Sequence, residues 1–235
     1  MRWSLETYVE KPLLAKSEVY GLVSLKDHLL HVASAIEVLA RHIGMDGHLC
    51  KKGALLHDIG KAHPIYQAFV HGFKEGIAIY HDLPHRHEIS SLAFLPLFPE
   101  EEWAPILEMV VAHHKSVIDD PRRRGLLDIV NYEGFDGLFE SHLKDWKVWS
   151  ERGLAILEEV NISTKPIPLP AAEKALEWAV EYCEELQDGW SEWKGILMAS
   201  DHMASALGRQ LQPFLNRMFF PPNITGWHEP NSLYP

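Results

Sequence analysis

An adjacent histidine and aspartate, His57 and Asp58, follow the apolar stretch Gly53-Ala-Leu-Leu and precede Gly60 and Lys61. Imidazole nitrogens suit Fe, Ni, Co, Mn and Zn, whereas carboxylate oxygens suit harder ions and can bridge two of them. We expect the pair to lie in the last turn of a helix that the glycine stops. Successive side chains there diverge by about 100°, so each can serve a different metal. A polar pair at an exposed helix end is the structural alternative, and the rest of the chain decides between the two.

Two further side chains of metal-binding type lie on apolar faces of predicted helices. His28 follows the apolar stripe of a helix predicted over residues 25–43, which Gly44 ends. Asp201 lies on the apolar face of a helix predicted over about residues 189–207, where a carboxylate is costly unless it is paired or bound to a metal. The alternatives are a hydrogen-bonded core histidine and a salt bridge from Asp201 to an inward lysine or arginine.

More histidines stand at the ends of predicted helices. His87 opens a short helix, and the adjacent pair His113 and His114 closes a helix predicted over about residues 101–114. Fifteen histidines in 235 residues is a high number, which favours a search for metal ligands. The histidines in or beside the aperiodic stretch 71–86 are interpreted as solvated or at the edge of a substrate site: His63, His71, His81 and His85.

The elements that must position these residues are all predicted to be helices. Apolar residues recur at steps of three and four, and no strand-like alternation is long enough to matter. Residues 1–20 are predicted to form a loosely packed entry, with Trp3 and Tyr8 on the body of the protein. Helices are predicted over residues 25–43, 47–59, a short stretch around Tyr66, from His87 onward, 101–114, 136–160, 171–187 and 189–207, with a break over 115–135 and a linker over 161–170.

Composition bounds the class of protein. A chain of 235 residues with 46% hydrophobic residues can bury one sizeable core and little more than one domain. The net charge of −11 argues against a dedicated duplex-binding module but does not exclude a nuclease, because bound metals add positive charge. Cys50 and Cys183 are interpreted as buried thiols in a reducing compartment. With no signal-peptide core and no apolar run of about 18 residues, we expect a soluble, cytoplasmic protein that has no membrane partner.

Five segments carry the candidate ligands: His28-Leu-Leu-His-Val-Ala33, Leu56-His57-Asp58-Ile-Gly60-Lys61, Arg86-His87-Glu88, Ala112-His113-His114 and Ser200-Asp201-His-Met-Ala-Ser205. Their order resembles that of the HD superfamily of metal-dependent phosphohydrolases. More narrowly, it resembles the HD nuclease domain of the type I CRISPR-associated helicase–nuclease, which the Arg-His-Glu, the double histidine and the Asp-x-x-x-Ser ending favour. That domain usually has a glycine after the double histidine, where this chain has Lys115.

The resemblance implies an all-α fold, an HD-domain helical bundle, that binds two divalent transition metals. Ligands rich in histidine favour Mn, Fe, Co or Ni over Mg, which prefers oxygen ligands. The implied ligands are His28, His57 and Asp201 for the first metal, His87, His113 and His114 for the second, and Asp58 as the bridge between them.

The resemblance also implies roles for polar residues beside the metals. Lys61 would act as a cation close to the reacting phosphate, with a surface lysine that caps its helix as the alternative. Ser205, one turn after Asp201, would hydrogen-bond a ligand or a phosphate oxygen. Basic residues of the break after the double histidine are candidate contacts to a nucleic-acid strand, with a solvated loop as the alternative: Lys115, Arg122, Arg123 and Arg124.

The function implied by the resemblance is a metal-dependent nuclease that hydrolyses phosphodiester bonds of single-stranded DNA in CRISPR interference. Its partners would be a helicase, in cis or in trans, and a target-bound surveillance complex. Residues 1–212 would form the nuclease domain, and the proline-rich, aperiodic residues 213–235 a linker toward a helicase domain. Two alternatives remain open. One is an HD phosphohydrolase that acts on nucleotides or cyclic nucleotides, and the other is a degenerate HD fold that serves only for docking.

Overall fold

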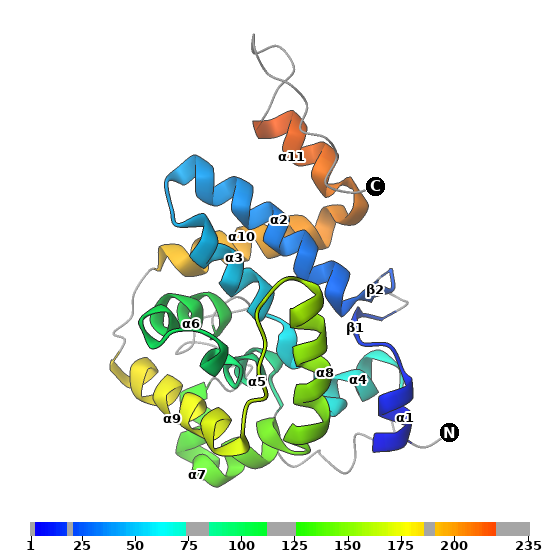
Figure 1. The fold of residues 1–235 in the computed structure, drawn as a ribbon, viewed down its shortest axis with the longest axis vertical. Coiled ribbons are helices and arrows are strands. Elements are labelled where there is room, and N and C mark those ends of the chain that lie inside the picture. Colours follow the sequence, from blue (N-terminus) through cyan, green and yellow to red (C-terminus); the bar gives the residue numbers. More distant parts are fainter. Residues whose placement is uncertain (1–2, 18–20, 74–84, 112–125, 186–190, 220–235) are drawn as a thin grey trace.

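The chain folds into a bundle of short helices with one antiparallel two-stranded hairpin (Figure 1). The computed structural model describes residues 3–17, 21–73, 85–111, 126–185 and 191–219. The helices are α1 (Leu5–Glu10), α2 (Leu25–Ile43), α3 (Gly47–Leu56), α4 (Pro64–Val70), α5 (His87–Leu92), α6 (Trp103–Val111), α7 (Leu126–Leu143), α8 (Trp146–Glu159), α9 (Leu169–Glu185), α10 (Glu192–Leu207) and α11 (Leu211–Phe219). The strands are β1 (Leu14–Lys16) and β2 (Val23–Ser24), and short 3-10 turns cover Ile59–Ala62, Leu95–Leu97, Glu100–Glu102 and Gly208–Gln210. The predicted all-α class is confirmed.

Helix α2 packs against α3 and α10, and the three lie together in the upper part of Figure 1. Ser24 caps its N-terminus by accepting a hydrogen bond from the Asp27 N–H at 3.0 Å. Gly44 ends it in the left-handed conformation, with φ of 77°. The predicted apolar stripe is buried over most of its length, but Ile43 at its end is exposed. This packing brings residues from the start and the end of the chain close to α3.

The helix that leads to the His57-Asp58 pair ends earlier than predicted. Helix α3 stops at Leu56, and His57 is its C-terminal cap residue. Asp58 follows with φ of −113° and ψ of 5°, and the chain then turns into the 3-10 turn Ile59–Ala62. The prediction that both residues belong to the last helical turn is therefore wrong. The change in backbone direction after His57 points the two side chains to a common centre.

Gly60 does not stop a helix but lies inside the 3-10 turn, where it packs against the start of α5. A Cβ atom at this position would collide with the carbonyl oxygen of His87 and lie 2.7 Å from the backbone nitrogen of Ser91. Glycine is required here because the two backbones approach too closely for any side chain. The close approach places the first residue of α5 beside the residues that follow α3.

The prediction of one helix over residues 136–160 is wrong. Residues 126–143 form α7, residues 146–159 form α8, and Asp145 between them has a left-handed conformation with φ of 57°. Residues 126–135, predicted as part of a break, are mostly helical, although Gly134 kinks α7 with φ of 68°. The spacing of apolar residues continues from α7 into α8, so it does not reveal that the chain changes direction at Asp145. Trp149, on α8, is fully buried in the core.

The stretch from Pro213 onward is not aperiodic throughout. Helix α11 extends to Phe219, packs against α2 and α10, and buries Leu211 and Leu215. Pro213 lies in its first turn, where the missing N–H of proline has no helical partner to lose. Residues 213–219 are therefore helical and packed on the body of the protein, contrary to the expected aperiodic stretch. Residues 220–235 lie outside the described part, and their role as a linker stays a prediction.

The N-terminal segment is fastened to the body more firmly than the expected loose entry. The hydroxyl of Tyr8 donates to the carbonyl oxygen of Ala62 at 2.6 Å. The guanidinium of Arg152, on α8, donates to the carbonyl oxygens of Tyr8 and Lys11, each at 2.6 Å. These bonds connect residues before α2 to the turn that follows Asp58, through Ala62, and to α8, through Arg152. Among the helices that the structure describes, none is long and apolar enough to span a membrane.

Candidate metal centre

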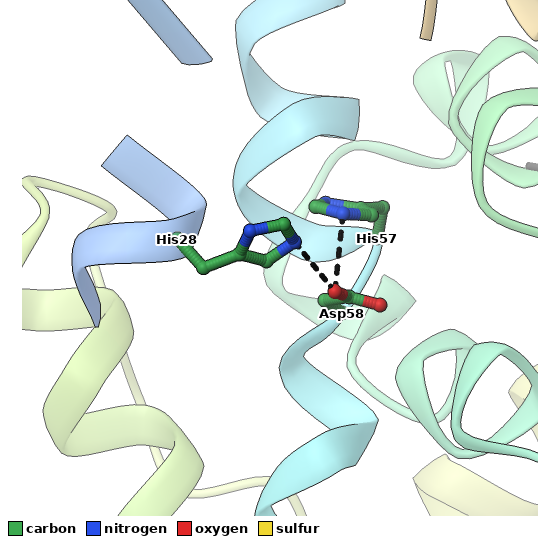
Figure 2. Close-up of side chains that lie close together, drawn as sticks. All are labelled: His28, His57 and Asp58. Carbon is green, nitrogen blue, oxygen red and sulfur yellow. Dashed lines mark ion pairs between the residues drawn. The ribbon is translucent and has the colours of Figure 1, made fainter. Parts of the chain in front are cut away.

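Three predicted ligands meet where α2 passes the end of α3 (Figure 2). The Nε2 of His28 lies 2.8 Å from Oδ2 of Asp58, and the Nε2 of His57 lies 3.3 Å from the same oxygen. All three side chains are buried. Each offers one ligand atom, and these atoms lie within 4.8 Å of one another. The cluster of His28, His57 and Asp58 can therefore hold a metal ion.

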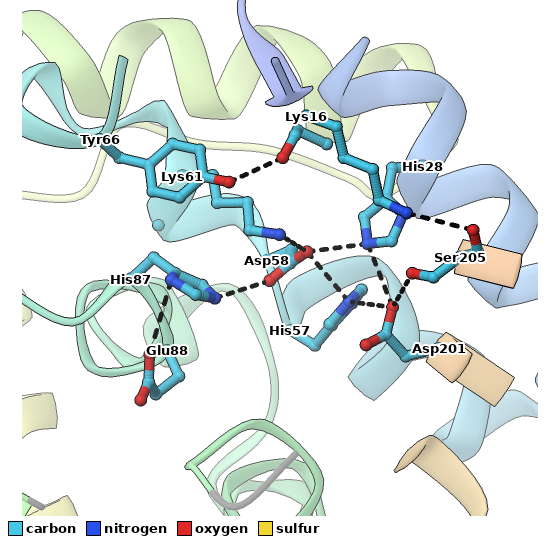
Figure 3. A network of polar contacts seen from close by, with 12 residues as sticks. Lys16, His28, His57, Asp58, Lys61, Tyr66, His87, Glu88, Asp201 and Ser205 are labelled. Carbon is cyan, nitrogen blue, oxygen red and sulfur yellow. Dashed lines mark hydrogen bonds and ion pairs between the residues drawn. The ribbon is translucent and has the colours of Figure 1, made fainter. Parts of the chain in front are cut away.

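Helix α10 brings Asp201 to the same centre from the far end of the chain (Figure 3). Its Oδ1 lies 3.4 Å from Nε2 of His28 and 4.0 Å from Nε2 of His57. One turn later, the hydroxyl of Ser205 donates to the same oxygen at 3.2 Å. The side chain of Asp201 is thus within reach of a metal at the cluster, and Ser205 has the orienting contact that was expected of it.

His87, the first residue of α5, approaches Asp58 from the other side. Its Nε2 lies 3.0 Å from Oδ1 of Asp58, the carboxylate oxygen that does not face His28. Its Nδ1 lies 3.6 Å from Glu88, which in turn accepts a hydrogen bond from Arg86 at 2.5 Å. The carboxylate of Asp58 therefore lies between two groups of imidazoles. This arrangement suits a carboxylate that bridges two metals.

The orientation of the His57 ring indicates what the centre can hold. Its Nδ1 donates to the carbonyl oxygen of Ala54 at 2.7 Å, so the Nε2 of the neutral ring carries a lone pair. That lone pair faces the carboxylate oxygens of Asp58 and Asp201. A lone pair directed at carboxylates is unfavourable unless a proton or a metal cation lies between them. The donor set therefore fits a divalent metal, with the ring fixed by its second nitrogen as is common for metal-binding histidines.

Burial and charge set the protonation of these rings. Burial lowers the pKa of His28 to about 4, although the hydrogen bond and charge of Asp58 act in the opposite direction. Burial likewise lowers the pKa of His87. Burial is the largest single influence on His57 and acts to lower its pKa, but the charge and hydrogen bond of Asp58, the charge of Asp201 and the bond to the Ala54 carbonyl together outweigh it, so the net shift is upward. His28 and His87 thus favour the neutral form that binds metals, whereas a metal must displace a proton more often at His57.

Lys61 is buried beside the cluster and is not a surface cap. Its Nζ donates to Oδ2 of Asp58 at 2.5 Å and lies 5.5 Å from the centre of the Tyr66 ring. Burial is the largest single influence on Lys61 and acts to lower its pKa, but the charge and hydrogen bond of Asp58 together with the charges of Tyr66 and Asp201 outweigh it and raise the pKa above its ordinary value. Lys61 is therefore a charged side chain at the centre, and the surface alternative is wrong.

Two residues beside the centre were not found from the sequence. The hydroxyl of Ser91 accepts a hydrogen bond from the Gly60 N–H at 2.8 Å and lies 2.9 Å from the carbonyl oxygen of His57 and 3.0 Å from that of His87. It joins the turn to α5. Ser91 follows His87 by four residues, so in a helix the two lie on the same face, and this spacing could have indicated its position. The second residue, Lys16, reaches the centre from the hairpin, and no sequence pattern distinguishes it from a surface lysine.

The remaining predicted site residues cannot be placed. His113 and His114, expected to complete a second metal site, lie outside the described residues, which stop at Val111 and resume at Leu126. The same holds for the predicted nucleic-acid contacts Lys115, Arg122, Arg123 and Arg124. Their roles stay predictions.

A second group of histidines, in which His63 and His142 are buried and His85 is partly buried, lies outside the metal cluster. The ring centres of His63 and His85 lie 4.3 Å apart, and those of His85 and His142 lie 5.4 Å apart. Trp149 covers His63, with ring centres 5.2 Å apart. The interpretation of His63 as a solvated or substrate-edge residue is therefore wrong, because Trp149 of α8 covers it, whereas His85 is only partly buried and its position at a substrate edge stays a prediction. His81, interpreted in the same way, lies outside the described residues.

Comparison with known families agrees with this geometry. The family model of the HD domain matches residues 25–165, which is more than half of the chain. The chain belongs to the HD family. No curated protein and no solved structure matches it significantly. The match to the HD domain covers His28, His57, Asp58 and His87 but ends before Asp201, which the fold brings to 3.4 Å from His28.

Membership of the HD family gives the centre its chemical class. HD domains bind divalent metals and act as metal-dependent hydrolases, and this HD chain has the buried His28, His57 and Asp58 cluster that such a metal needs. The cluster therefore argues against the two alternative interpretations, an exposed polar pair for His57 and Asp58 and a hydrogen-bonded core histidine for His28.

Proposed function

We propose that this HD protein is a metal-dependent nuclease that hydrolyses phosphodiester bonds of single-stranded DNA in CRISPR interference. The observation that carries the proposal is the position of Asp58 between His28 and His57 at one oxygen and His87 at the other. A bridging carboxylate with ligands on both sides favours two metals, which suits the cleavage of a phosphodiester.

The chemistry of the centre follows from its donor set. Bound divalent metals would lower the pKa of a water molecule and neutralise charge on the phosphate oxygens. The imidazoles of His28, His57 and His87 favour Mn, Fe, Co or Ni over Mg. We propose that His113 and His114 complete the second site. Lys61 holds Asp58 in place with a charged hydrogen bond, and its positive charge favours an approaching phosphate.

The choice of single-stranded DNA rests on the motifs shared with the nuclease subfamily, Arg86-His87-Glu88 and the run from Asp201 to Ser205. A net charge of −11 gives the chain little long-range attraction for DNA. We therefore propose that a helicase and a target-bound surveillance complex deliver the strand and select the sequence. The tail after residue 219 would lead toward the helicase.

An HD phosphohydrolase that acts on nucleotides or cyclic nucleotides would use the same centre, and the HD match supports it equally. Substrate preference separates the two functions. The full chain is incubated with Mn, Fe, Co, Ni or Mg and either end-labelled single-stranded DNA or a panel of free and cyclic nucleotides. We expect cleavage of the DNA with the transition metals. Turnover of nucleotides with intact DNA would instead assign the alternative.

The site assignment is tested with the double variant His57→Ala, Asp58→Ala. We expect it to fold and to lose DNA cleavage to background. His48→Ala is the matched control, because His48 is an exposed histidine on the same helix, and it should cleave like the unchanged protein. A double variant that still cuts DNA with added Mn would remove the centre from the mechanism. A metal-free wild-type protein that takes up no metal would favour a docking role.

A further inference from the structure

A lysine from outside the matched HD region reaches the metal centre. Lys16 ends strand β1, nine residues before the HD match begins at residue 25. Its side chain extends past His28, and its Nζ donates to the carbonyl oxygen of Ser205 at 3.3 Å (Figure 3). The ammonium group therefore lies on the Asp201 side of the cluster, whereas that of Lys61 lies at Asp58.

Strand β1 is held in position by the element that follows the metal-ligand turn. The amide of Gln67, on α4, accepts from the Leu14 N–H at 3.0 Å and donates to the Leu14 carbonyl oxygen at 2.9 Å. The hydroxyl of Tyr66 donates to the carbonyl oxygen of Ala15 at 2.7 Å. Two consecutive residues are thus fixed by side chains, and the next one is Lys16. This anchoring fixes the backbone from which the Lys16 side chain extends, so on binding only side-chain freedom is lost.

The two lysines differ in what they bind within the protein. Lys61 is buried and makes a close ion pair with Asp58. Lys16 is half-buried, and within the described residues its hydrogen bond is to a single carbonyl oxygen, that of Ser205, at the long distance of 3.3 Å. Burial lowers the pKa of Lys16, the charge of Asp201 acts to raise it, and that of Lys61 acts to lower it further. The amine is thus influenced by the charges of both Asp201 and Lys61, but no close ion pair holds it in the described part of the chain.

We propose that Lys16 binds a phosphate oxygen of the substrate on the Asp201 side of the metal centre. The proposal rests on the proposed phosphodiesterase function and adds a substrate-binding residue to it. A lysine ammonium is a flexible point charge that forms charge-assisted hydrogen bonds with phosphate. When substrate binds, Lys16 would exchange its long bond to the Ser205 carbonyl oxygen for a bond to a phosphate oxygen.

The competing explanation is that Lys16 only stabilises the end of α10, because basic side chains favour the last carbonyl groups of a helix. The two explanations predict different effects of a Lys16 substitution on stability and on substrate affinity. A capping lysine affects unfolding, whereas a phosphate-binding lysine affects affinity for phosphodiesters and leaves unfolding nearly unchanged.

The experiment measures binding of the full chain, loaded with Mn²⁺, to a fluorescent oligothymidine with phosphorothioate linkages that resist hydrolysis. Thymidine monophosphate is measured in parallel, so that a strand and a free nucleotide are distinguished as sources of the phosphate. The variants are Lys16→Gln and Lys16→Arg. Lys26→Gln is the matched control, since Lys26 is exposed and paired with Glu159 at 2.8 Å. Thermal unfolding is recorded for each variant.

We expect Lys16→Gln to bind the oligonucleotide about tenfold more weakly, the size of one charge-assisted hydrogen bond. Lys16→Arg should bind close to wild type, Lys26→Gln should be unchanged, and all should unfold alike. Equal affinity of Lys16→Gln and wild type, or no binding by the wild type, overturns the proposal. So does a Lys16→Gln variant that is destabilised but binds normally.

A second measurement does not depend on the folding of any variant. Reductive methylation of lysines, read by peptide mass spectrometry, should be slowed at Lys16 and not at Lys26 when the oligonucleotide is bound, and equal rates would contradict the contact. The hydrolysis assay is read separately. If Lys16→Gln weakens oligonucleotide binding but the wild type hydrolyses no substrate with any of the metals, the proposed function alone is overturned. If the wild type and Lys16→Gln hydrolyse DNA at the same rate, this inference alone is overturned.

Discussion

The Nζ of Lys61 lies 2.5 Å from Oδ2 of Asp58, and both side chains are buried. Removal of one partner of a buried ion pair leaves an uncompensated charge and costs about 3–5 kcal/mol. We therefore expect Lys61→Met to lower the free energy of unfolding of the metal-free protein by that order, measured by chemical denaturation. Added Mn²⁺ should recover part of the loss, because the cation replaces the missing positive charge.

Lys52→Met is the control for this prediction. Lys52 pairs with Glu102 at 2.6 Å, but the two side chains are 33% and 24% exposed. Solvent screening limits such a pair to about 1 kcal/mol. Equal losses for Lys61→Met and Lys52→Met would mean that burial of the Asp58 pair has no energetic consequence.

The contact between Gly60 and α5 leads to a second prediction. Gly60→Ala should destabilise the protein by about 1–3 kcal/mol or more, because a methyl group meets the backbone of His87 and Ser91. The displaced α5 should also weaken metal binding. Gly47→Ala, in a helical position with open space around it, should be neutral or stabilising. Thermal unfolding of both variants checks this, and a harmless Gly60→Ala would disprove the close approach.

The buried histidine group predicts how stability depends on pH. Burial lowers the pKa of His142 to about 4 and holds that of His63 well below its ordinary value of 6.5. Because the unfolded chain binds the extra protons, the contribution of these two histidines to stability is complete above about pH 6.5 and falls as the pH decreases toward 4. His142 alone contributes about 3 kcal/mol at most across this range. Denaturation of the metal-free protein at several pH values measures the slope.

A variant isolates the contribution of His142. His142→Gln keeps a polar group but cannot be protonated in this range, so its free energy of unfolding should change less between pH 6.5 and pH 4 than that of the wild type. The variant itself loses some stability at neutral pH, since the ring of His142 bonds to Leu138 and Arg86. The test is the change in the free energy of unfolding between pH 6.5 and pH 4. The same change in the variant and the wild type would contradict a buried neutral ring at His142.

Metal stoichiometry tests whether Asp58 bridges two ions. We expect the full chain to bind two Mn²⁺ ions, and His87→Ala to bind one with the other site intact. His57→Ala should lose the first site. Binding should weaken below neutral pH, because the raised pKa of His57 makes protons stronger competitors for its Nε2. Calorimetry together with metal analysis provides the count, and a single ion in the wild type would remove the bridging role.

Sequence patterns predicted the helices with continuous apolar stripes, such as α2 and α10, and hence the inward positions of His28 and Asp201. They failed where direction changes without a change in hydrophobicity, as at Asp145, and where a glycine is needed for packing, as at Gly60. Periodicity reports which face of an element is buried, but not where the chain turns. The contacts of Ser91 and Lys16 arise between distant elements, so no local pattern contains them.

The hydroxyl of Tyr8 supports the Ala62 carbonyl oxygen, yet Tyr8 precedes the region matched by the HD family. A recombinant fragment trimmed to begin at residue 25 would discard this support, strip the partner groups from Gln67 and Tyr66, and delete Lys16. Laboratories that choose expression boundaries from the family match alone would therefore be working with a weakened protein, and the first two dozen residues belong in every clone.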